Sequence, residues 1–122
     1  MLENFQNLMT IPSLQLQIRE FRDARDWMQF HTPKDMAMAI SIEAAELQEH
    51  FRWVATEQSH ARAMERRDKV KEEIADIGMY LFELADNLGI DLLEAMAEKL
   101  KKNGEKYPVE KAKGRSAKYD EL

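Results

Sequence analysis

Cysteine is absent from this sequence, and long apolar runs are absent as well. Without cysteine the chain cannot form disulfides, cysteine-based zinc sites, iron–sulfur clusters or a thiol nucleophile. No apolar run reaches the roughly 20 residues of a membrane-spanning helix, and residues 1–10 lack the basic start and apolar middle of a signal peptide. We therefore expect a soluble cytoplasmic protein with no membrane partner.

Glycine and proline are also scarce, with four and three residues among 122. Ala, Leu, Met, Glu, Gln, Lys and Arg dominate, which favours helix almost everywhere and predicts an all-α fold. No repeat or long linker divides the chain, so we expect one domain over residues 1–122, with 107–122 as an extended C-terminal arm. The predicted helices cover about 13–29, 33–53, 61–88 and 91–103. Short loops between four helices suggest an antiparallel four-helix bundle.

The expected helix boundaries rest on capping residues. They are Ser13 as N-cap of the first helix, Thr32 and Pro33 at the start of the second, Gly89 at the end of the third, Asp91 with Glu94 as a capping box for the fourth, and Gly104 at its end.

Charge and hydropathy indicate the kind of partner. The net charge is −5, and residues 1–97 are acidic, which argues against a nucleic-acid-binding surface. Residues 98–118 are basic and could meet a small anion. Large apolar residues between Ile77 and Phe82 point all around the predicted helix, whereas a helix on the outside of a monomer needs one wet face. We therefore expect a homo-oligomer.

Two pairs of carboxylates lie where apolar residues are expected. On a helical wheel, Glu43 and Glu46 fall inside the apolar arc of the second helix, and Glu73 and Asp76 lie at the flank and rim of the apolar stripe of the third. Each pair has i, i+3 spacing and so shares one helix face. Two like charges about 5 Å apart repel by roughly 3 kcal/mol at an effective dielectric of about 20.

Such a cluster requires protonation or neutralisation. The simpler alternative is that the carboxylates tilt outward and pair with Lys69 and Arg66. Because two pairs occur on adjacent helices, we favour an oxygen-only site for a hard cation such as Mg²⁺, with Mn²⁺ as a possible substitute.

The flanking residues carry a resemblance to a known family. The matching segments are Arg25-Asp26-Trp27-x-x-Phe30-His31-x-Pro33, Glu43-x-x-Glu46, Phe51-x-Trp53, Glu72-Glu73-Ile74-Ala75-Asp76-Ile77-x-x-Tyr80-Leu81, Lys99-x-x-x-Asn103-x-x-Lys106-Tyr107-Pro108 and Ser116-x-Lys118-Tyr119-x-Glu121-Leu122. From about Leu14 to the C-terminus the sequence resembles the MazG-like all-α nucleotide pyrophosphohydrolases, and in particular their dCTP pyrophosphatase branch.

This resemblance implies an enzyme. The implied reaction is Mg²⁺-dependent hydrolysis of a deoxynucleoside triphosphate, with dCTP or a modified dCTP as the best candidate, to the monophosphate and pyrophosphate, for nucleotide pool control or housecleaning. The implied assembly is a tetramer built as a dimer of dimers. The implied catalytic metal ligands are Glu43, Glu46, Glu73 and Asp76. The general base stays open, with Glu49 and Glu72 as lower-ranked candidates.

The resemblance and the spacing also suggest substrate-binding residues. Trp27 and Trp53 resemble residues that enclose the base in this family, although either could be a core residue. His31 and Tyr80 are further candidates, although His31 could also cap a helix junction and Tyr80 could also be a core residue. Lys99, Asn103 and Lys106 share a helix face where a triphosphate could bind or where cations complement a helix C-terminus. The remaining candidates are Tyr107, Arg115 and Lys118. At Ile18 the sequence departs from the eukaryotic dCTP enzymes, which we associate with a base-contacting His there.

Two other readings compete with an enzyme of this kind. A carboxylate-bridged di-iron bundle needs two Glu-x-x-His motifs, and the sequence offers only Glu57-x-x-His60. A non-catalytic helical interaction module could use the acidic groove to bind a basic partner. Its binding would survive Glu43→Gln and would ignore Mg²⁺.

Overall fold

A computed structural model describes residues 9–122 of the chain. This part of the chain is all-α, as predicted, and contains no β-strand. Its helices are α2 (Ile11–Ala24), α3 (Pro33–Glu49), α4 (Ser59–Glu65), α5 (Arg67–Asn87), α6 (Leu92–Lys106) and α7 (Val109–Ala112), with short 3₁₀ turns at Met28–Phe30, Thr56–Gln58 and Tyr119–Glu121. None of the helices described is long and apolar enough to cross a membrane. Residues 1–8 of the predicted domain lie outside the described range.

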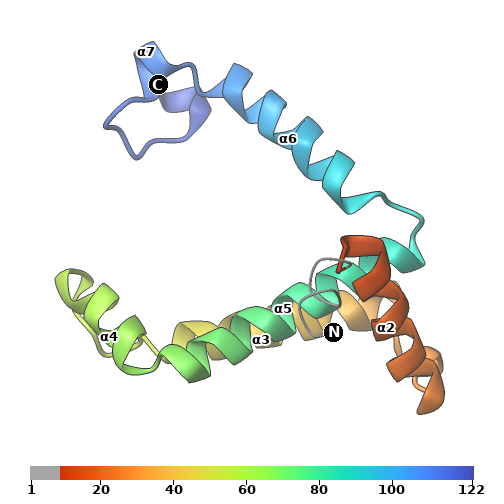
Figure 1. Cartoon of the computed structure of the whole chain (residues 1–122). Helices are drawn as coiled ribbons and strands as arrows, with labels where there is room; N and C mark the ends of the chain where they lie inside the picture. Colours follow the sequence, from red (N-terminus) through yellow and green to blue (C-terminus); the bar gives the residue numbers. More distant parts are fainter. Residues whose placement is uncertain (1–8) are drawn as a thin grey trace.

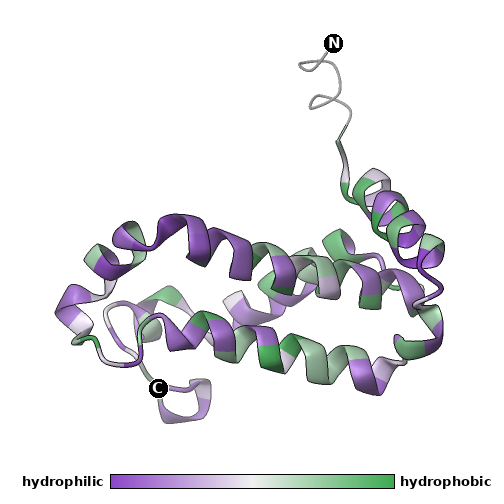
Figure 2. Cartoon of the chain, turned by 90° about the horizontal axis from the view of Figure 1, so that it is seen from below, coloured by the Kyte–Doolittle hydropathy of each residue, from purple (hydrophilic) through white to green (hydrophobic). Residues whose placement is uncertain are grey.

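Helices α3 and α5 form the main packed pair. They run side by side in both views of the chain, and α2 packs against the end of α5 (Figures 1 and 2). The start of α5 is hydrophilic, whereas hydrophobic residues gather toward its α2 end (Figure 2). Met36 of α3 and Ala85 of α5 are the buried hydrophobic residues of the described chain. The core therefore lies where α2, α3 and α5 meet.

The first helix begins and ends earlier than predicted. Its N-cap is Thr10, and Ser13 lies three residues inside, where the two residues form a reciprocal capping box. The prediction of Ser13 as N-cap is therefore wrong. The helix ends at Ala24 because Asp26 adopts a positive φ of 54° and the Trp27 amide bonds to the Arg22 carbonyl. After this tight turn the Trp27 ring lies against Phe21 of α2, with ring centroids 5.8 Å apart.

Other boundaries are confirmed or corrected. Thr32 caps α3, Asp91 caps α6, and Gly89 ends α5 with a φ of 66°, all as predicted. The predicted helix 61–88 is two helices, because Arg66 leaves the helical region. The second predicted helix ends at Glu49, not near residue 53.

The predicted stop of the fourth helix at Gly104 is wrong, because α6 continues to Lys106. A glycine inside a helix costs only about 1 kcal/mol, whereas Pro108 disfavours helical geometry in the residue before it. The segment 107–122 is not extended: it turns back on itself (Figure 1), and the Tyr107 and Tyr119 rings meet edge to face at 6.2 Å.

Helix α6 points away from the packed helices (Figure 1). It joins α5 through a short turn and does not lie along α3, so residues 9–122 of a single chain do not form the antiparallel four-helix bundle expected. Three of its apolar side chains stay exposed: Leu93, Met96 and Leu100.

Candidate functional site

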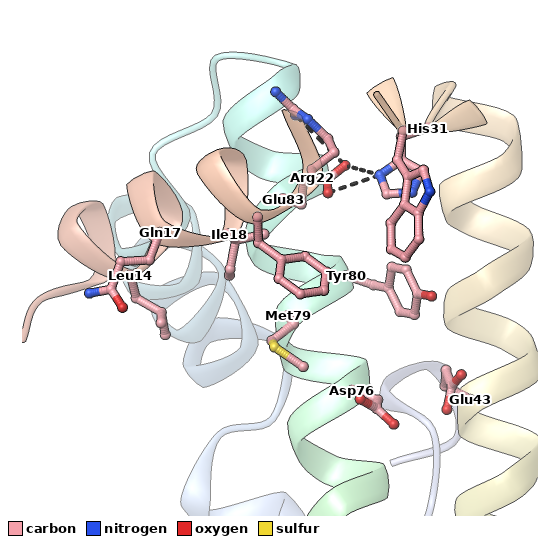
Figure 3. A pocket seen from close by; sticks show the side chains of 12 residues that line it. Leu14, Gln17, Ile18, Arg22, His31, Glu43, Asp76, Met79, Tyr80 and Glu83 are labelled. Atoms are coloured by element: carbon pink, nitrogen blue, oxygen red, sulfur yellow. Dashed lines mark hydrogen bonds and ion pairs between the residues drawn. The ribbon is translucent and has the colours of Figure 1, made fainter. Parts of the chain in front are cut away.

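A pocket of about 550 Å³ lies where α2, α3, α5 and the Trp27–His31 segment meet (Figure 3). Its lining combines an apolar wall with charged groups at both ends. The lining residues are Leu14, Gln17, Ile18, Phe21, Arg22, Trp27, His31, Glu43, Asp76, Met79, Tyr80 and Glu83. Asp76, Tyr80 and Glu83 lie along one face of α5, so this helix runs the length of the pocket (Figure 3).

Three predicted carboxylates converge at one end of this pocket. Glu43 comes from α3, and Glu73 and Asp76 come from α5; one oxygen from each lies within 4.8 Å of the others. One buried oxygen each of Glu43 and Glu73 has no hydrogen-bond partner among residues 9–122. Glu73 lies 3.7 Å from His50 Nε2, and no ion pair to Lys69 or Arg66 forms within the described chain. The outward-paired alternative is thus not what the structure adopts.

The charges of this cluster act on one another. Burial, followed by a hydrogen bond with Glu46 and the charges of Glu46, Asp76 and Glu73, raises the pKa of Glu43 from 4.5 to about 7. Burial and the nearby carboxylates also raise the pKa of Tyr80. Glu46 is exposed and flanks the group of three. We call Glu43, Glu46, Glu73 and Asp76 the carboxylate cluster.

The opposite end of the pocket holds a different acidic group. Glu83 is only 4% exposed, and its carboxylate accepts a hydrogen bond from His31 Nδ1 at 2.8 Å (Figure 3). It also accepts one from Asn87 Nδ2 at 3.1 Å. Buried Arg22 lies 3.9 Å from Glu83 and donates to Asn87 and to Asp23. We call Arg22, His31, Glu83 and Asn87 the Glu83 network. Its buried charge is compensated within the protein.

With this geometry in view, comparison with known proteins identifies the family. The model of the MazG-like family matches residues 38–122, which include the whole carboxylate cluster. The chain belongs to the MazG-like family. The resemblance expected from the sequence is therefore confirmed.

Individual relatives of this MazG-like chain point the same way. It is similar to dCTP pyrophosphatase 1 of Bos taurus (37% identity) and of Homo sapiens (35%), in each case over 84% of this chain and 62% of the relative. The match thus spans less than two thirds of these curated relatives. A crystal structure of a pyrophosphatase from Archaeoglobus fulgidus superimposes with a TM-score of 0.77 at 44% identity, covering 80% of this chain and 91% of that one.

The carboxylate cluster of this MazG-like protein has the properties of a divalent-cation site. All its donors are oxygens, which hard cations such as Mg²⁺ and Mn²⁺ prefer. The unpartnered buried oxygens of Glu43 and Glu73 and the raised pKa of Glu43 indicate negative charge that no lysine or arginine of residues 9–122 neutralises. These residues therefore fit a bound metal ion.

The other predicted residues divide into two groups. Trp27, His31 and Tyr80 line the pocket. Trp53 is 83% exposed and lies beyond the end of α3, outside the pocket lining. The remaining candidates lie on α6 or the segment after it, away from the pocket of the same chain (Figure 1): Lys99, Asn103, Lys106, Tyr107, Arg115 and Lys118. Their roles stay predictions.

The sequence analysis missed the Glu83 network. Glu83 follows Asp76 by seven residues, nearly two full turns, so both project from one face of α5. That spacing could have singled out Glu83. The partnership with Arg22 and Asn87 could not have been found this way, because it depends on how α2 crosses α5.

Proposed function

We propose that this MazG-like protein is a Mg²⁺-dependent pyrophosphohydrolase that converts a deoxynucleoside triphosphate, with dCTP or a modified dCTP as the best candidate, to its monophosphate and pyrophosphate. The observation that carries the proposal is a single pocket with a metal-competent carboxylate cluster at one end and Trp27 at the other. The dCTP pyrophosphatase relatives support the same reaction. The proposed role is control or housecleaning of the cytoplasmic nucleotide pool.

The carboxylate cluster would hold the metal. Glu43, Glu73 and Asp76 lie close enough to share an ion, and exposed Glu46 beside Glu43 is positioned to complete the set. When bound, Mg²⁺ supplies positive charge that offsets carboxylate repulsion and phosphate charge, and it makes water a better nucleophile. The reaction requires that a water oxygen bond to the α-phosphorus while the bond from that phosphorus to the α,β-bridging oxygen breaks. Pyrophosphate then leaves with the electron pair of that bond.

The length of the pocket suits a nucleotide. Asp76 and Glu83 are separated by seven residues of helix, a rise of about 10 Å at about 1.5 Å per residue. This length can place the α-phosphate at the carboxylate cluster and the base near Trp27, with Tyr80 between them. Trp27 is 40% exposed, packs edge to face on Phe21 at 5.8 Å and has the Arg25 guanidinium 5.9 Å from its ring centroid. The exposed part of the ring would stack on a base.

We further propose that the bundle is completed by other copies of the chain, in a tetramer built as a dimer of dimers. Ile74 and Leu81 of α5, Leu88 just after it, and Leu93, Met96 and Leu100 of α6 are exposed in the single chain, although a chain of this length can bury a substantial core. A neighbouring copy that covers these surfaces would also bring its basic α6 and Trp53 toward the pocket. Sedimentation analysis of the wild type and Leu100→Glu tests this: the wild type should sediment as an oligomer, and the variant should dissociate.

The reaction is tested by pyrophosphate release. The four dNTPs, the four NTPs and 5-methyl-dCTP are assayed with Mg²⁺ and with EDTA. Release that requires Mg²⁺ and favours deoxycytidine nucleotides supports the proposal. No release from folded protein in the presence of Mg²⁺ would overturn it and would favour the interaction module.

A further inference from the structure

The Glu83 network gives the base end of the pocket a fixed hydrogen-bonding character. The Glu83 carboxylate can only accept hydrogen bonds when ionised, so the proton it shares with His31 is carried by His31 Nδ1. Nε2 is then the ring nitrogen that remains for a ligand, and it has no hydrogen-bond partner among residues 9–122. In a neutral imidazole with its proton on Nδ1, Nε2 is an acceptor.

Two further groups face the Glu83 carboxylate besides His31. Arg22 lies 3.9 Å from it, and Asn87 donates a hydrogen bond to it at 3.1 Å. His31, Arg22 and Asn87 thus share the compensation of this buried carboxylate. Arg22 Nε and Nη1 are already used by Asp23 and Asn87.

Part of the pocket lining near these groups is apolar and cannot form hydrogen bonds to a base. Ile18, Phe21 and Met79 form an apolar wall, which cannot supply a hydrogen bond to a base edge. Selectivity between bases of similar shape then depends on the polar lining residues, which at this end of the pocket include His31 and Glu83. Both the Glu83 carboxylate and neutral His31 Nε2 accept hydrogen bonds, so a base with an amino group can pair with them, whereas a keto oxygen at the same position cannot.

We propose that Glu83 is a positioning residue that holds a neutral His31 with its single ring proton on Nδ1, so that Nε2 accepts a hydrogen bond and selects nucleotides whose base carries an exocyclic amino group. This inference rests on the proposed function for its substrate. It assigns the preference for cytosine over uracil, which differ at this edge by amino against keto, to a residue that contacts His31 and acts through it.

The kinetic test compares dCTP with dUTP in the wild type, Glu83→Gln and His31→Asn. The wild type should favour dCTP in kcat/KM by about tenfold or more, the value of roughly one hydrogen bond. In Glu83→Gln the amide can either donate or accept, so both histidine tautomers become available and the preference should fall toward one. His31→Asn keeps a donor near Glu83 and removes Nε2, with the same loss of preference. Asp86→Asn is the matched control, an acid on the same helix that pairs with Arg19 outside the pocket lining, and its preference should match the wild type.

A spectroscopic test separates this inference from the proposed reaction. Nitrogen-15 chemical shifts of the His31 ring in the nucleotide-free protein, assigned with His31→Asn, should show the proton on Nδ1 in the wild type and a mixture of tautomers in Glu83→Gln. This holds whether or not the protein hydrolyses any nucleotide. Hydrolysis without a dCTP preference, an unchanged preference in Glu83→Gln, or a wild-type proton on Nε2 would each overturn the inference while leaving the reaction in place. If no nucleotide is turned over, titration with dCMP and dUMP replaces the kinetic comparison, and equal affinities overturn the inference.

Discussion

The two ends of the pocket place the same kind of side chain in opposite electrostatic states. At the carboxylate cluster, buried oxygens of Glu43 and Glu73 have no hydrogen-bond partner among residues 9–122, and burial together with the neighbouring carboxylates raises the pKa of Glu43 to about 7. In the Glu83 network the buried carboxylate has His31, Asn87 and Arg22 around it. The first end holds repulsion that a cation can relieve, whereas the charge at the second end is compensated within the protein. Reaction and recognition thus have different physical requirements within one cavity.

The largest expected effect is the loss of turnover when a residue of the carboxylate cluster is substituted. Asp76→Asn keeps the shape of the side chain and removes a charge that the cation needs, so pyrophosphate release should fall by at least about 100-fold, as for other removed electrostatic contacts to a reacting centre. The melting temperature should stay the same or rise, because one repelling charge is gone. Glu20→Gln, an exposed acid on α2, is the matched control and should keep wild-type activity. Retention of more than about a tenth of the activity by Asp76→Asn would contradict its assignment as a ligand.

In the Glu83 network, removal of a charge should lower the stability of the protein, in contrast to the carboxylate cluster. Arg22→Met leaves the buried Glu83 charge without its cation, and breaking such a buried pair is expected to cost about 3 kcal/mol of unfolding free energy. Arg19→Met on the same helix is the control: its pair with Asp86 is partly exposed, so its loss should cost about 1 kcal/mol or less. Urea unfolding of both variants measures the difference. Equal losses of unfolding free energy in the two variants would show that Arg22 contributes no more to stability than the partly exposed Arg19.

A smaller effect separates stacking from hydrogen bonding at the base end. Trp27→Ala should raise KM for dCTP and dUTP alike by about tenfold, because stacking on an aromatic face contributes about 1–3 kcal/mol for any base. The ratio between the two substrates should stay near that of the wild type, unlike in Glu83→Gln. Steady-state kinetics on both nucleotides decides this. An unchanged KM would instead make Trp27 a packing residue against Phe21.

Local sequence patterns predicted the elements that depend on neighbouring residues. Thr32, Asp91 and Gly89 mark helix ends through their own side chains or backbone freedom, and the structure confirms them. The i, i+3 spacing of the carboxylates predicted their shared faces, and three of the four meet within 4.8 Å. Sequence periodicity is therefore sufficient to predict which side chains share one face of a helix.

Tertiary contacts decided the features that were missed. The end of α2 depends on the turn at Asp26, and the direction of α6 depends on which surfaces α5 leaves open. The partners of Glu83 come from α2, from the segment before α3 and from α5 itself, so no single helical wheel contains them. Lys99, Asn103 and Lys106 share a face of α6 as the spacing implied, but they do not line the pocket of their own chain, and their predicted role in substrate binding stays a prediction.

The smallest expected effect is a pH dependence of stability at the carboxylate cluster. In the unfolded chain Glu43 loses its proton near 4.5, whereas in the folded chain it keeps the proton to about 7. Between these values the folded state binds more protons, so the unfolding free energy should fall as pH rises from about 4.5 to about 7 and should level off above that. Because Glu43 is partly exposed, the contribution should be no more than about 1 kcal/mol.

The difference in unfolding free energy between wild type and Glu43→Gln isolates this contribution, since other titrating groups are common to both proteins. In EDTA, the unfolding free energy of Glu43→Gln relative to the wild type should increase between pH 5 and pH 8. For Glu20→Gln the difference from the wild type should stay constant over this range. Millimolar Mg²⁺ should reverse this relative increase in stability. The cation favours the charged form of Glu43 in the wild type, and the glutamine amide of the variant binds Mg²⁺ less well. A difference that stays constant with pH in EDTA would show that neither burial nor the neighbouring carboxylates raise the pKa of Glu43. The contrast between the two ends of the pocket would then rest on the Glu83 network alone.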